Sequence, residues 1–174
     1  MLINVLTALF TFTHLINPWE VILILLATAY IVYLLTPSSA PNTDYAIDIP
    51  SDTSIYMYLL SAWLGRLPLI QALLPFYIIL NSVLFYIDYR VANASYTIAS
   101  WVTMHIIFAI PILWWTVAVW RCSNNKATRP WASAARFITI TVYYEYLLRF
   151  IIRYYYPKIW FNCQQLMIEF GDCF

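Results

Sequence analysis

Three ionisable residues stand at helical spacing inside a strongly apolar segment. Glu145, Arg149 and Arg153 are four residues apart, so they share one helical face, which Thr141 continues. A charged group within a membrane is expensive unless it meets a partner or a water-filled path. The stripe is read either as an internal ion pair that fixes helix packing or as a functional group. The functional readings are a proton or ion relay and a docking site for an anionic lipid or a quinone head. We favour the ion pair.

Both histidines of the chain, His14 and His105, lie within apolar segments. Two neutral imidazoles from different helices can ligate a b-type haem between them. Their expected depths differ, because His14 lies just before a break at Asn17 and Pro18 whereas His105 lies well inside its segment. We therefore expect each histidine to bond a neighbouring helix and expect no cofactor, with haem b kept as an alternative.

The three cysteines give no metal or redox motif. Cys122, Cys163 and Cys173 contain no pair at C-x-x-C spacing, which excludes the usual zinc and dithiol sites. A disulfide between Cys163 and Cys173 is one reading of the C-terminal tail, and two unpaired thiols at a membrane interface are the other, which we favour. Cys122 is expected to stay reduced.

The composition indicates what surrounds these residues. Of 174 residues, 63% are hydrophobic and 10% are charged, whereas soluble domains carry about 25% charged residues. A soluble fold of this size would leave a large apolar surface facing water. The 15 Tyr and 8 Trp crowd near the ends of the apolar segments, as membrane interfaces favour. The net charge of +1 comes with no concentrated basic stripe, which argues against a nucleic-acid partner. Lipid is the expected surrounding.

The apolar segments predict an all-α, polytopic membrane protein with one membrane domain over residues 1–174. At 1.5 Å rise per residue, a core of about 30 Å takes roughly 20 residues. Four segments approach that length: residues 18–36, 67–87, 97–120 and 131–156. Shorter apolar segments are expected to be interfacial or partial helices: residues 1–16, 55–64 and 159–170. A turn is expected over residues 88–96.

The charges between the last two segments predict a side of the membrane. Residues 121–136 contain no acidic residue and four basic ones: Arg121, Lys126, Arg129 and Arg136. By the positive-inside rule, this loop faces the cytoplasm. The predicted location is a cell inner (cytoplasmic) membrane, crossed several times.

The same region carries a partial resemblance. A span ends in W-R-[SC]-[SA]-x-N, a short polar turn follows, and the next span opens with W and then A-[RK]. The matching positions are Trp120, Arg121, Cys122, Ser123, Asn125, Trp131, Ala135 and Arg136. Residues 114–136 thereby resemble small bacterial inner-membrane proteins of unknown role. The resemblance implies a tight helical hairpin in a bacterial membrane and no activity.

These features favour an accessory or structural subunit of a larger membrane complex over an enzyme. No catalytic motif is present, yet aromatic and aliphatic residues cover more faces than four helices need among themselves. The expected partners are the lipid bilayer and other membrane subunits. Two alternatives stay open. One is a small oligomeric channel or transporter that uses Glu145 together with kinks at Pro75 and Pro111, and the other is a membrane b-type cytochrome that uses His14 and His105.

Overall fold

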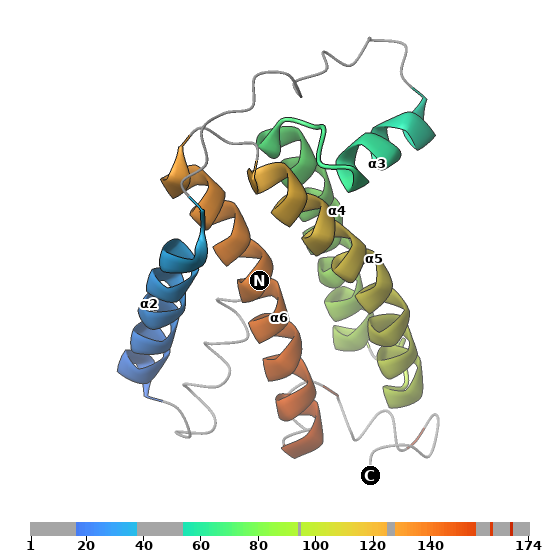
Figure 1. Ribbon diagram of the computed structural model, residues 1–174. Coiled ribbons are helices and arrows are strands. Elements are labelled where there is room, and N and C mark those ends of the chain that lie inside the picture. Colours follow the sequence, from blue (N-terminus) through green and yellow to red (C-terminus); the bar gives the residue numbers. More distant parts are fainter. Residues whose placement is uncertain are drawn as a thin grey trace. The chain divides into compact units, whose positions relative to one another are not determined.

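The computed structural model describes residues 17–37, 54–93, 95–124 and 128–155, together with residues 161 and 168. All regular structure in these ranges is helical (Figure 1). The elements, in chain order, are α2 (Pro18–Leu35), α3 (Ile55–Trp63), α4 (Leu69–Ala92), α5 (Ile98–Asn124) and α6 (Arg129–Tyr155). The expected all-α class is confirmed. The segments expected as helices at residues 1–16 and 159–170 lie outside the described residues, apart from residues 161 and 168.

The start of α2 follows directly from its sequence. The Asn17 side chain accepts a hydrogen bond from the Trp19 amide at 3.2 Å, and the Asn17 amide donates to the Glu20 carboxylate at 3.4 Å. This reciprocal pair satisfies two amides that the first helical turn leaves without partners, and Pro18 at the first helical position needs no such partner. The start predicted at Asn17 and Pro18 is therefore confirmed.

Among the described residues, three helices are long and apolar enough to cross a membrane: α2, α4 and α5. They have 18, 24 and 27 residues and match the first three predicted spans. The helix α6 also has 27 residues, but its charged side chains make it less apolar. Its role as the fourth span stays a prediction. Both α4 and α5 continue through an internal proline, Pro75 and Pro111.

Two boundaries predicted from polar residues were wrong. The turn expected over residues 88–96 begins later, because α4 continues through Asp88 to Ala92. The loop expected over residues 121–136 shrinks to the short connection between Asn124 and Arg129, since both flanking helices extend into it. In each case the charged side chains find partners while the backbone stays helical, so charge alone does not end the helix.

The described residues pack as two compact units. The first unit takes residues 79–110 and 142–155 of the helices, together with residues 17–22. Its buried apolar centre contains Ile87 and Val91 of α4, Trp101 of α5, and Phe161. Around this centre lie partly buried residues from three helices and from the connection between α4 and α5: Val83, Tyr96, Ile98, Val102, Met104 and Phe150. Apolar burial therefore holds these parts of α4, α5 and α6 together.

The second unit takes residues 23–78 and 111–141. Small side chains fill much of its interior, and five buried alanines are Ala62, Ala72, Ala118, Ala132 and Ala135. Small residues let membrane helices approach closely, where van der Waals contact replaces the hydrophobic driving force of water. The buried Trp115 of α5 adds a hydrogen bond from its indole nitrogen to the Ala72 carbonyl of α4 at 3.2 Å.

A glycine allows the close contact between the α3–α4 turn and α5 within this second unit. Gly65 has a positive φ of 74°, a conformation that side chains with a Cβ rarely adopt. A Cβ added there would lie 2.9 Å from Arg121 Cβ and 3.1 Å from the Arg121 carbonyl carbon. Strain and steric overlap would therefore act together at this position.

We predict that Gly65→Ala lowers the free energy of unfolding by about 2 kcal/mol, because it combines a left-handed backbone with overpacking. The measurement is denaturant titration of the protein in detergent micelles, followed by tryptophan fluorescence. The control is Leu64→Ala at the neighbouring position, which is exposed and should cost less than about 0.5 kcal/mol. Equal stabilities for the two variants would contradict the assigned role of Gly65.

Candidate functional site

The guanidinium of Arg149 lies at the centre of a buried ion cluster in the first unit. Its Nη1 and Nη2 donate to the two carboxylate oxygens of Asp88 at 2.6 and 3.1 Å. Its Nη2 and Nε donate to Oε1 of Glu145 at 2.8 and 3.2 Å. Arg149 is 0% exposed, Glu145 is 6% exposed, and the Asp88 side chain is 26% exposed. We call Asp88, Glu145 and Arg149 the ion cluster.

Helical spacing explains half of the ion cluster and tertiary packing explains the rest. Glu145 and Arg149 are one turn apart on α6, as their i, i+4 spacing predicts. Asp88 comes from α4, 61 residues earlier, and forms the bidentate pair that an arginine fork suits. Sequence analysis missed Asp88 because it assigned this residue to a turn. The signal in the sequence was Arg149 itself, because a buried arginine needs a second hydrogen-bonding partner besides Glu145.

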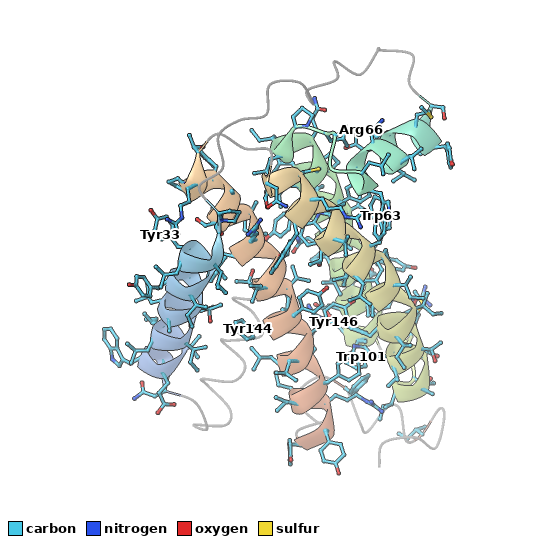
Figure 2. All side chains as sticks on the ribbon, in the orientation of Figure 1. Tyr33, Trp63, Arg66, Trp101, Tyr144 and Tyr146 are labelled. Carbon is cyan, nitrogen blue, oxygen red and sulfur yellow. The ribbon has the colours of Figure 1, made fainter. Side chains whose placement is uncertain are left out.

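A row of aromatic rings lies beside the ion cluster, in the same unit. His105 stacks on Trp101 with ring centroids 3.8 Å apart, and its ring lies 5.5 Å from that of Tyr146 and 6.0 Å from that of Phe150. Trp101 of α5 and Tyr146 of α6 lie between these two helices (Figure 2). Like the ion cluster, this aromatic cluster joins α6 to another helix of the unit.

Three polar atoms of this aromatic cluster are buried without a hydrogen-bond partner among the described residues. They are Trp101 Nε1, His105 Nε2 and the Tyr146 hydroxyl. His105 Nδ1 lies 2.9 Å from the Trp101 carbonyl, so Nδ1 carries the proton and Nε2 is an acceptor in the neutral ring. One donor, one acceptor and one hydroxyl are the partners that a buried water molecule takes. The cluster is thus chemically suited to hold water.

The remaining candidates from the sequence fall in different places. Arg153 lies with its guanidinium carbon 5.8 Å from the Trp101 ring centroid, outside the ion cluster. Cys122 is a buried free thiol. His14, Cys163 and Cys173 lie outside the described residues, so the haem and disulfide hypotheses stay predictions. No group of three or more potential metal ligands occurs within the described part of the chain.

We predict that Arg149→Met lowers the free energy of unfolding by about 3 to 5 kcal/mol, because it leaves two carboxylates close together without their counter-ion. The measurement is denaturant titration in micelles. The control is Arg153→Met, the same change one turn further along α6, which should cost less than about 1 kcal/mol.

The triple variant Asp88→Asn, Glu145→Gln, Arg149→Met removes every charge of the ion cluster. It should be more stable than Arg149→Met alone, since no uncompensated charge remains. A triple variant that is less stable than the single one would contradict an electrostatic cause for the loss.

Comparison with known proteins gives no family for this chain. No protein-family model, no curated protein and no solved structure matches it. The proposals that follow therefore rest on its own residues and their geometry.

Proposed function

We propose that this protein is a non-catalytic accessory subunit that packs against a larger protein complex in a bacterial inner membrane. The observation that carries the proposal is the exposure of α2. Within this helix only Val32 is buried, although apolar side chains surround the whole circumference. A helix that is apolar on all faces belongs in lipid or against other helices.

The exposed face of α2 also carries a tyrosine hydroxyl, which hydrocarbon cannot hydrogen-bond. Tyr30 is 64% exposed, and no hydrogen bond to its hydroxyl is seen among the described residues. Hydrocarbon offers a phenol hydroxyl no acceptor, whereas a neighbouring protein helix or a headgroup does. Leu23, Leu26 and Leu34 flank Tyr30 at helical spacing and are all more than half exposed. Together these residues form a surface that a second membrane helix fits, with aliphatic contacts around one hydrogen bond.

We predict that the wild-type protein, extracted in mild detergent at native expression, migrates in native mass measurement as a complex well above its own 20.4 kDa. The variant Leu26→Trp should reduce the recovered partner, because it changes the shape of the exposed face of α2. The control is Ile110→Trp on α5, which is also exposed and should leave the complex intact. A wild-type chain that migrates alone under several mild conditions would count against the proposal.

The second candidate is a small oligomeric channel or transporter that uses Glu145. It is supported by the composition of the ion cluster, in which two carboxylates share one guanidinium. Trp101, His105 and Tyr146 belong to the same unit, and each has a buried polar atom that finds no partner among the described residues and suits bound water. Carboxylates next to water in a membrane interior are typical of proton relays. A path of this kind in so few helices requires several copies of the chain.

We predict for this second candidate that Glu145→Gln abolishes proton flux in reconstituted vesicles, because glutamine cannot exchange a proton. The flux is read from a pH-sensitive dye inside the vesicles. Glu20→Gln serves as the control, since Glu20 lies at the start of α2 and its replacement keeps an acceptor for the helix start. Flux that is unchanged in Glu145→Gln would eliminate this candidate.

A further inference from the structure

The helix α3 presents an exposed apolar face. The helix has nine residues, none of them charged, and Leu64 follows at its C-terminal cap. Tyr56, Leu60 and Leu64 stand at four-residue spacing, and Met57 lies beside them, so the four share one side of the helix. Each of the four is between 36% and 69% exposed. We call these four residues the outer face of α3.

The opposite side of α3 is fixed to α4 and α5 within the second unit. The Tyr58 hydroxyl donates to the Gln71 carbonyl of α4 at 2.6 Å. Trp63 stacks on Trp114 of α5, and the Trp63 carbonyl accepts a hydrogen bond from Arg121 Nη1 at 2.8 Å. These contacts fix the rotation of α3 about its own axis. The outer face therefore points away from α4 and α5.

The helix α3 is too short to cross a membrane, and it runs at an angle to the start of α4 (Figure 1). At 1.5 Å per residue, its nine residues extend over about 14 Å, less than half of a hydrocarbon core of about 30 Å. The ends of a helix leave backbone groups without intrahelical partners, and hydrocarbon offers them none. A position in the membrane interface, where water and headgroups are present, suits such a helix.

The sequence of α4 links α3 to one boundary of the membrane. The part of α4 that precedes Asp88, residues 69–87, contains no charged residue. Its helical length is about 29 Å, close to the thickness of the hydrocarbon core. A crossing by α4 therefore uses this whole stretch and puts Leu69 near one boundary of the core. Only residues 64–68 separate Leu69 from α3, so α3 lies near the same boundary.

The composition of the outer face suits lipid at this boundary. In water, the outer face would leave three large apolar side chains exposed side by side. At a bilayer surface, such side chains reach the acyl chains, while a tyrosine hydroxyl stays at the level of the headgroups. Tyr56 is the most exposed of the four and lies in the first turn of α3. A lipid neighbour follows from the boundary position itself, whereas a protein neighbour would require a second contact besides the one proposed at α2.

We propose that the outer face of α3 binds the membrane surface, with α3 lying in the interface between hydrocarbon and headgroups. Met57, Leu60 and Leu64 contact the first methylene groups of acyl chains, and the Tyr56 hydroxyl bonds to a headgroup oxygen. Because α3 has no charged side chain, this contact does not select among headgroups. Sequence analysis expected an interfacial or partial helix over residues 55–64. The structure adds which side of it meets lipid and which contacts hold it there.

The test measures the surroundings of a nitroxide on the outer face, in the full chain reconstituted into phosphatidylcholine vesicles. The label is attached to Leu60→Cys or Leu64→Cys after replacement of the native cysteines, and its collision rates with oxygen and with a water-soluble nickel chelate are compared. At both positions we expect oxygen collisions to exceed nickel collisions several-fold. The control is Arg66→Cys, an exposed position in the turn after α3 (Figure 2), where nickel collisions should dominate.

Two results of this experiment would overturn the proposal. Nickel collision rates at Leu60 and Leu64 that match the rate at Arg66 would show that the outer face meets water. Low collision rates with both reagents would show that protein covers it.

A second measurement uses the wild-type chain and does not depend on replacing cysteines. Phosphatidylcholine or phosphatidylglycerol with a photoreactive diazirine near the start of one acyl chain is crosslinked in vesicles, and the modified residues are mapped by mass spectrometry. We expect adducts on the outer face of α3, with yields that differ by no more than about twofold between the two lipids, because α3 has no basic side chain to attract an anionic headgroup. Adducts on α2, α4 and α5 with none on α3 would overturn the proposal. A larger difference in favour of phosphatidylglycerol would also overturn it, since charge rather than apolar contact would then attract the lipid.

Discussion

Hydrocarbon cannot solvate a charge or an unpaired backbone group, and the rest of the structure depends on this constraint. It explains why the residues exposed on α2, α4 and α5 are overwhelmingly apolar. It also explains why the most buried cation, Arg149, is held by two carboxylates through four hydrogen bonds. Such a cluster adds little net stability compared with apolar packing. Its effect is to specify which face of α6 meets which turn of α4.

The arginines of the second unit meet the same constraint with neutral partners. Arg129 donates to the Tyr33 and Leu34 carbonyls in the last turn of α2, and the Tyr33 carbonyl also accepts from the Thr36 amide. Arg121 and Arg136 combine carbonyl, hydroxyl and amide acceptors with tryptophan rings. Carboxylates appear where Arg149 is buried in the first unit, and neutral acceptors with indole rings appear at the helix ends of the second. Among the described residues, the arginines of the second unit therefore have no carboxylate partner.

The sequence predicted those features that local spacing determines. The helical class, the start of α2 and the pairing of Glu145 with Arg149 follow from apolar segments, from capping residues and from i, i+4 geometry. Asp88 was missed because its partner, Arg149, lies on another helix. The charge of Asp88 was interpreted as marking the end of a membrane span. The lengths of α5 and α6 were underestimated because the charges of Arg121 and Arg136 were interpreted as marking a loop. The burial of polar atoms of Trp101, His105 and Tyr146 without a partner among the described residues results from tertiary packing, so no sequence pattern contained it.

The central claim is that the membrane interior, made up of lipid and of the helices of a partner subunit, surrounds α2 in place of water. Hydrogen–deuterium exchange of the full chain in lipid nanodiscs tests it most directly. An 18-residue helix with one buried side chain would open readily in water, so its amides would exchange fast. In lipid there is no water to exchange with, and we expect the amides in the middle of α2 to stay protected for hours. Exchange of these amides within seconds would contradict the account.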